Sequence, residues 1–128
     1  MLPEQYNLLI GALLVATKAE KLKWKTSPSN RHQFTLTPTN EQRILIDRYY
    51  ALENGAQLPC VNMTIFSNPE EHIIDEIVIC ESALPEEEAS FRLLQELYEV
   101  VLAQADRDNA EKIKPILAHI TESVSRAM

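Results

Sequence analysis

The chain has 128 residues, of which 45% are hydrophobic, and it carries a formal net charge of -7 at pH 7. This length and hydrophobic fraction predict one folded domain over residues 1–128 and exclude global disorder. The chain's two glycines cannot supply a G-x-G-x-x-G loop or a Walker A loop, which excludes the common Gly-rich phosphate-binding sites. The acidic balance argues against binding to nucleic acid, whose phosphates require Lys and Arg.

An apolar run near the N-terminus, residues 8–16, has to be distinguished from a signal peptide or a membrane span. Residues 2–7 contain no Lys or Arg, so the positive region of a signal peptide is missing. The run is also far shorter than the roughly 20 residues that cross a bilayer. We therefore expect a buried helix face and no membrane contact. Cys60 and Cys80 form the one disulfide that this chain could make, and we expect the reducing cytoplasm.

The first predicted element is a helix that begins near Pro3 and fades near Lys21. Its apolar residues follow the spacing of one helix face: Tyr6, Leu9, Ile10, Leu13 and Leu14. Basic residues follow as a candidate basic patch: Lys18, Lys21, Lys23, Lys25 and Arg31. We interpret this patch as a solvated helix end that runs into an edge strand.

The apolar spacing then changes to the alternation of half-buried strands. Five strands are expected, separated by turn signals: residues 22–25, 32–37, 43–50, 61–66 and 73–80. The last is apolar on both faces, which favours a central position in the sheet or a strand end under a helix. Residues 56–59 look like slack chain, so we expect a loose connection ending at Pro59, with Cys60 in the turn, rather than a tight hairpin. The connections are too short for parallel crossovers, which predicts an antiparallel meander.

After Glu81 the helical period returns. Pro85 marks a first helix, whose stripe is Phe91, Leu94, Tyr98, Val101, Leu102 and Ala105. Residues 106–109 are expected to break it, and Asp108 with Glu111 looks like a capping pair. A second helix follows, and Pro115 either starts or kinks it. Its stripe is Ile113, Ile116, Leu117, Ile120 and Val124. The expected fold is α+β, with an N-terminal helix, a five-stranded antiparallel meander and two C-terminal helices.

The segment from Leu13 to Trp24 ends in Lys21-Leu22-Lys23-Trp24. It resembles the start of a group of small, uncharacterised bacterial proteins in which a helix is followed by a Lys-Leu-x-Trp strand start. Residues 74–77 and 94–99 are similar to theirs in order and spacing. Those proteins often have Gly where this chain has Glu20, and a Gly-containing hairpin in place of residues 68–71. The resemblance covers most of the chain and implies a shared α+β fold, but no activity, cofactor or site residue.

The histidines offer the densest candidate site. No H-E-x-x-H pair or C-x-x-C pair is present. Glu71 and His72, with Asp75 close by, could serve acid–base or metal chemistry, but we interpret them as a charged turn and strand entry. His32 would join them only if the second and fifth strands were neighbours. His119 is expected at the edge of the last helix's stripe.

Cys80 is interpreted as a small core residue, although its place five residues before a helix start would also suit a cysteine nucleophile. Trp24 is expected to be a core anchor, the alternative being a ligand-facing ring at the end of the sheet. Tyr49 and Tyr50 must point to opposite faces, so one ring is expected to be exposed, and together with Phe66 it could form an apolar patch of the kind that binds a partner.

The sequence therefore assigns no catalytic, cofactor-binding or metal-binding residue. We expect a non-catalytic, cytoplasmic protein-interaction or adaptor module, with an unidentified protein partner and homodimerisation as its expected state. The two C-terminal helices either cover their own sheet or form the dimer interface. One alternative is a small hydrolase or metal-assisted enzyme that uses His72 with Glu71, or His32. Another is an acidic secretion-type chaperone, which a helix at residues 50–60 would favour.

Overall fold

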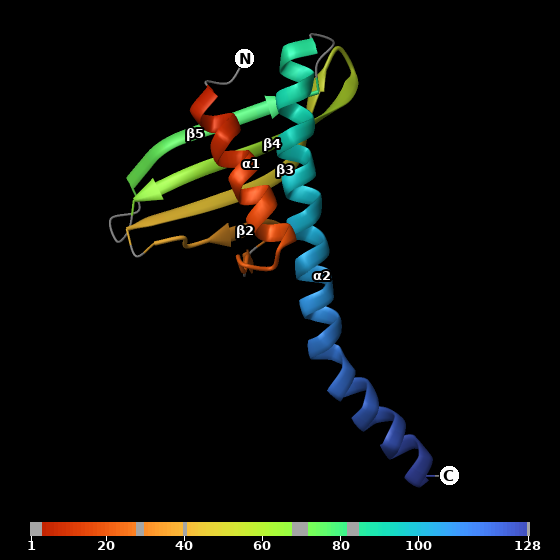
Figure 1. Cartoon of the computed structure of the whole chain (residues 1–128). Coiled ribbons are helices and arrows are strands. Elements are labelled where there is room, and N and C mark those ends of the chain that lie inside the picture. The colour runs from red at the N-terminus through yellow and green to blue at the C-terminus, as the bar shows by residue number, and fades with distance from the viewer. Residues whose placement is uncertain (1–3, 28–29, 40, 68–71, 82–84, 128) are drawn as a thin grey trace.

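The structure is a computed structural model that describes residues 4–27, 30–39, 41–67, 72–81 and 85–127. Within these residues the chain forms two helices and five strands: α1 (Glu4–Lys18), β1 (Lys25–Ser27), β2 (Asn30–Leu36), β3 (Gln42–Glu53), β4 (Ala56–Ser67), β5 (His72–Cys80) and α2 (Pro85–Ala127). Figure 1 shows α1 and the first half of α2 side by side over the sheet, while the second half of α2 extends beyond it.

The strands form one sheet in the order β1-β2-β3-β4-β5, and each strand is antiparallel to its neighbours. This confirms the predicted meander and the α+β class. Ile46 on β3 lies opposite Phe34 on β2 and Met63 on β4, and Met63 lies opposite Ile77 on β5. These side chains are buried, so they form one apolar row across the sheet face that the helices cover.

The connection between β3 and β4 is a tight two-residue hairpin, so the expected loose connection is wrong. Glu53 pairs with Ala56, and Asn54 and Gly55 between them have φ values of 51° and 79°. Positive φ at both central residues is the signature of a type I′ turn, whose twist matches that of the strands. Pro59 does not break β4. The neighbouring strand β5 ends at Cys80, opposite Cys60, so no strand residue on that side requires the amide that Pro59 lacks. The Pro59 carbonyl accepts a hydrogen bond from the Glu81 amide at 3.0 Å.

The end of α1 uses a residue in the left-handed backbone region. Glu20 has a φ of 60°, and the Lys21 amide donates to the Ala16 carbonyl at 2.9 Å. This arrangement caps the exposed carbonyls at the end of the helix and is commonly made with Gly. The first strand starts later than expected, at Lys25, so Trp24 lies just before β1 rather than within it.

The C-terminal region is one continuous helix, so the prediction of two helices is wrong. Residues 106–109 include Asp and Asn but neither Pro nor Gly. Each Asp or Asn disfavours a helix by only a few tenths of a kcal/mol, which is too little to end α2. Asp108 and Glu111 therefore lie within the helix and do not cap a new one. Pro115 is likewise inside α2, where its ring removes the hydrogen bond to the Glu111 carbonyl. At 1.5 Å per residue the helix is about 64 Å long.

The predicted stripes of α1 and of the first half of α2 are confirmed as core-facing. Ile10, Leu13 and Leu14 of α1 are buried in the same cluster as Phe91, Leu94 and Tyr98 of α2 and the inner side chains of the sheet. Burial of α2 ends at Ala105, which leaves the rest of the helix outside the core. Among the described helices, none combines the length and apolarity needed to cross a membrane.

Candidate functional site

The histidine-containing candidate sites do not come together. His32 lies on β2 and His72 begins β5, and the sheet order places β3 and β4 between them. Neighbouring strands are roughly 4.8 Å apart, so β2 and β5 are about 14 Å apart. Both histidines are exposed, and so is His119 on α2. Glu71, the expected partner of His72, lies outside the described residues.

The acidic residue next to this group has a structural partner. Asp75 accepts a hydrogen bond from the Tyr6 hydroxyl, which ties α1 to β5. Within the described ranges there is also no cluster of three or more His, Cys, Asp or Glu side chains that could hold a metal ion. The described residues therefore offer neither a joined His32–His72 site nor a metal cluster.

Both cysteines are joined in a disulfide. Cys60 lies inside β4 and directly opposite Cys80 on β5, so the expectation that Cys60 is in a turn is wrong. A cysteine nucleophile must be a thiolate, and a disulfide-bonded sulfur is not one. In this state Cys80 is therefore neither a free core thiol nor a nucleophile.

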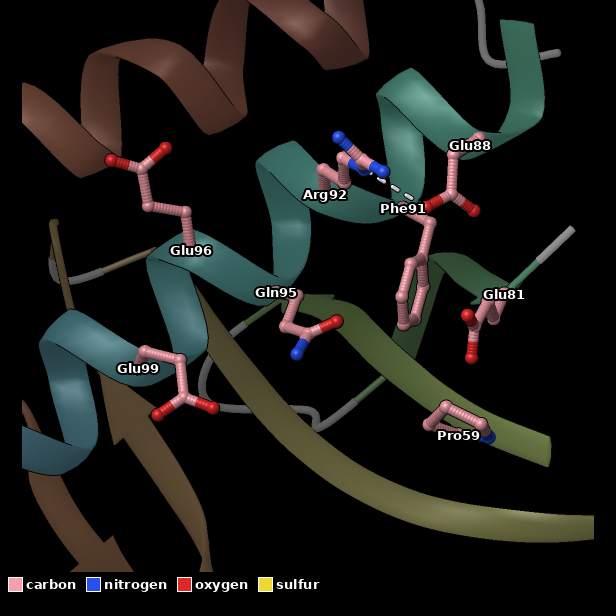
Figure 2. Close-up of a pocket in the computed structure, with 8 residues that line it drawn as sticks. All are labelled: Pro59, Glu81, Glu88, Phe91, Arg92, Gln95, Glu96 and Glu99. Atoms are coloured by element: carbon pink, nitrogen blue, oxygen red, sulfur yellow. Dashed lines mark hydrogen bonds and ion pairs between the residues drawn. The ribbon is translucent and has the colours of Figure 1, made fainter. Parts of the chain in front are cut away.

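A hollow of about 450 Å³ lies between the first turns of α2 and the strand ends, and it is strongly acidic. Figure 2 shows Phe91 pointing from α2 towards the strands, with Glu81 beside it and Glu88 joined to Arg92. The Arg92 Nε–Glu88 Oε1 distance is 2.9 Å. Two further carboxylates at the rim are ion-paired as well. Lys18 holds Glu96 at 2.8 Å, and Arg48 holds Glu99 at 2.6 Å.

These ion pairs decide what the hollow can do. Three of its carboxylates, Glu88, Glu96 and Glu99, are each held by a cation from the chain itself. Pairs that are at least partly exposed contribute little to stability, but each of these three carboxylates already faces a cation of its own chain. The carboxylates therefore do not converge on one point, and we assign no ligand to the hollow.

A buried polar network explains the role of Trp24, and its central residue was missed by the sequence prediction. The Gln104 side chain on α2 accepts a hydrogen bond from the Trp24 amide at 2.9 Å and donates one to the Leu22 carbonyl at 2.9 Å. The Trp24 indole donates to the Thr17 hydroxyl at 3.0 Å. Trp24 is 4% exposed and Gln104 is 2% exposed. Trp24 is thus a core anchor that joins α1, the segment before β1 and α2, and the ligand-facing alternative is wrong.

Tyr98 holds α2 to the sheet in a second contact. Its hydroxyl donates to the His32 carbonyl at 2.8 Å, and its ring packs edge-on against Phe34 with centroids 5.6 Å apart. The Arg48 guanidinium lies 4.7 Å from the ring centroid. Burial raises the pKa of the Tyr98 hydroxyl above its usual value, although Arg48 acts in the opposite direction.

The expected aromatic patch does not form. Tyr49 and Tyr50 are both exposed, as alternation allows. Tyr49 lies opposite Cys60, however, six residues along β4 from Phe66, which is a separation of roughly 20 Å. Phe66 instead packs against Arg43, whose guanidinium carbon is 4.8 Å from the ring centroid. The three rings therefore do not share one surface.

A long exposed apolar surface lies on α2. Every residue from 109 to 126 is exposed, and we call this segment the projecting end of α2. It carries the apolar stripe predicted from the sequence, with exposed fractions of 53% to 61%: Ile113, Ile116, Leu117, Ile120 and Val124. Single exposed aliphatic residues are ordinary, whereas a continuous stripe of this kind is a candidate interaction surface.

A second exposed apolar surface lies on α1, on the side that faces away from the sheet. Leu8 is 66% exposed and Val15 is 69% exposed. Ala12 and Ala19 lie on the same face, and we call these four side chains the α1 outer face. They line a shallow hollow of about 630 Å³ along the helix.

No protein family, curated relative or solved structure matches the chain.

Proposed function

We propose that this protein is a non-catalytic, self-associating protein-interaction module whose contact surface is the projecting end of α2. The observation that carries the proposal is the exposed apolar stripe on that end, which runs outside the core of its own chain. Figure 1 shows this part of α2 running away from both the sheet and α1.

The energetics favour a partner for this segment. The five stripe side chains are a little more than half exposed. Fully burying an aliphatic side chain stabilises by about 1.5–3 kcal/mol, so covering this stripe would stabilise a complex by about 4–8 kcal/mol on one side. Helices of about 12–15 residues are marginal on their own, and an interior proline disfavours a helix by about 3 kcal/mol. The residues that follow Pro115 are therefore expected to gain order when a partner covers them.

The chemistry of the stripe favours a protein as the partner. Its side chains are aliphatic, and hydrophobic contact at helical spacing is how one amphipathic helix recognises another. The chain carries 19 acidic residues against 12 basic ones, which disfavours nucleic acid and anionic membranes. We propose a second copy as the partner, because every copy carries the same exposed stripe.

For the compartment we propose the cytoplasm, and the Cys60–Cys80 bond is the observation that opposes it. Glutathione keeps such a pair reduced in the cytoplasm, whereas an oxidising compartment preserves the bond. Acid quenching of native cells, followed by alkylation of free thiols in denaturant and mass spectrometry, distinguishes the two. Alkylated Cys60 and Cys80 support the cytoplasm, and an intact disulfide overturns it.

Neither alternative function gains an observation in its favour. The enzyme proposal used His72 with Glu71, or His32. The sheet order separates His32 from His72, and the described residues contain no group of three or more potential metal ligands. Residues 50–60 form the end of β3, a turn and the start of β4, rather than the helix that would favour a secretion-type chaperone.

The proposal is tested by sedimentation equilibrium on the intact chain. The wild type is expected to be a dimer at tens of micromolar, and Leu117→Asp is expected to raise its dissociation constant at least tenfold. Ala118→Asp is the matched control, because Ala118 is also exposed and lies about 100° around the helix from Leu117, outside the apolar stripe. A wild type that is monomeric at several hundred micromolar, or equal effects of the two variants, would overturn the proposal.

A further inference from the structure

We propose that the projecting end of α2 packs, antiparallel, on the α1 outer face of a second copy, and that the partner's projecting end does the same in return. This inference rests on the proposed self-association and names the surface that receives the helix.

The two surfaces have the same spacing. On α1 the outer face is formed by Leu8, Ala12, Val15 and Ala19, with intervals of four, three and four residues. On α2 the centre of the stripe has the same intervals: Ile113, Leu117, Ile120 and Val124. This is the spacing of the a and d positions of a coiled coil, at which side chains of one helix fit between those of another.

Antiparallel pairing of these positions places small residues opposite large ones. Ala12 would face Ile120, and Ala19 would face Ile113. In the other two pairs, Val15 would face Leu117 and Leu8 would face Val124. Alternation of large and small side chains across an interface allows the two helices to interdigitate. A stripe of uniformly large side chains fits the hollow on α1 because two of the positions there are alanine.

The lengths of the two surfaces also match. Each spans twelve residues, from Leu8 to Ala19 and from Ile113 to Val124, which places the first and last Cα atoms about 16 Å apart along the helix. Arg107, just before the projecting end, lies 3.7 Å from Glu20 at the end of α1. The projecting end therefore begins where α1 of the same chain ends and runs away from it, as Figure 1 shows. Because α2 is continuous, the stripe cannot reach its own α1, and a second copy must supply this face.

The buried area separates this arrangement from one in which two projecting ends pair with each other. If a fully exposed aliphatic side chain offers about 100 Å² of apolar area, two stripes bury about 550 Å². Including both α1 outer faces raises this to about 900 Å². Roughly 60% of an interface is apolar, so the total areas are about 900 and 1,500 Å². The second value lies within the range of about 1,200–2,000 Å² that stable interfaces bury, and the first does not.

Two complementary charge variants test the arrangement in the intact protein. Val15→Lys and Leu117→Glu each place a charge at the level where these residues are proposed to meet. Each variant alone is expected to weaken its own dimer at least tenfold by sedimentation equilibrium. Mixed in equal amounts, they are expected to form a heterodimer, because Lys from one copy then faces Glu from the other. Gln5→Lys and Ala118→Glu are the matched controls, since both positions are exposed but lie outside the proposed contact.

The outcomes separate this inference from the function on which it rests. Loss of dimer in both variants, with recovery on mixing, supports the arrangement. If Leu117→Glu disrupts the dimer and Val15→Lys does not, the projecting end contacts another surface and the inference is overturned, while the proposed self-association stands. A monomeric wild type overturns both. Unchanged far-ultraviolet circular dichroism and thermal midpoints of diluted variants show that the monomer fold is intact, because both substituted side chains are exposed in it.

Discussion

Replacing Gln104 with Leu is expected to destabilise the fold more than any ordinary polar substitution on α2. The Gln104 side chain satisfies two buried backbone groups, the Trp24 amide and the Leu22 carbonyl, at 2.9 Å each. Leu has a similar size, so it leaves little cavity but removes both hydrogen bonds. An unsatisfied buried polar group costs about 1–3 kcal/mol, so the expected loss of unfolding free energy is about 2–5 kcal/mol.

Urea and thermal denaturation measure this loss. For a chain of this length the unfolding entropy is roughly 0.27 kcal/mol/K, so a loss of about 3 kcal/mol lowers the thermal midpoint by about 11 °C. Gln95→Leu on the same helix is the matched control, because Gln95 is only partly buried and lines the rim of the acidic hollow. If Gln104→Leu and Gln95→Leu differ by less than about 0.5 kcal/mol, ordered water or backbone movement replaces the lost bonds and the network does not join α1 to α2 as argued.

Other predictions concern single features of the fold. Glu20→Gly is expected to stabilise the protein by about 0.5–1 kcal/mol in urea denaturation, because Gly accepts the positive φ of 60° without strain; a loss of stability would show that the Glu20 side chain contributes more than its backbone angle costs. Because burial raises the pKa of Tyr98 in the folded state, its contribution to stability is complete below about pH 10 and declines as the pH rises through the folded-state pKa. Unfolding at pH 8 and pH 11 should therefore show a smaller alkaline loss for Tyr98→Phe than for the wild type, and equal losses would contradict the assignment. Reduction of the Cys60–Cys80 bond, which closes a separation of 20 residues, is expected to lower stability by about 3 kcal/mol in the chain-entropy account. The Cys60→Ala, Cys80→Ala double variant should show no response to reductant, and a reductant effect in it would point to another cause.

The elements that could be predicted from the sequence are those specified by local periodicity. Alternation over residues 32–37 and 61–66 and helical spacing from Tyr6 to Leu14 reflect one buried face each, so the pattern alone indicates the sheet, α1 and the antiparallel order. Residues 73–80 are apolar on both faces, which favours a central strand, whereas β5 lies at the edge of the sheet. The helical spacing also predicts the apolar stripe on the projecting end of α2. It does not predict whether the sheet of the same chain covers that stripe, because the residues of a stripe do not reveal what packs against them.

The errors have equally local causes. A proline close to a turn signal favours a loop, yet Pro59 lies in β4, because a proline is tolerated where the neighbouring strand has ended. Residues 106–109 were interpreted as a break because Asp and Asn favour caps, yet the helix propensity of such residues is only slightly below average. Gln104 was overlooked because its partners are about 80 residues away in the chain. Its place on the buried side of α2, between Val101 and Ala105, is the one signal in the sequence that could have revealed it, since a buried polar side chain requires partners.

The continuity of α2 has a consequence for how its exposed half folds. Starting a helix in water is the slow and unfavourable step, whereas adding a turn to an existing helix is nearly neutral. The turns of α2 that Tyr98 and Gln104 anchor are already helical. The residues beyond Ala105 can therefore add to this helix, or unfold from it, one turn at a time. Amide hydrogen exchange along α2 should then become progressively faster towards Arg126. A binding partner would extend an existing helix and would not have to nucleate a new one.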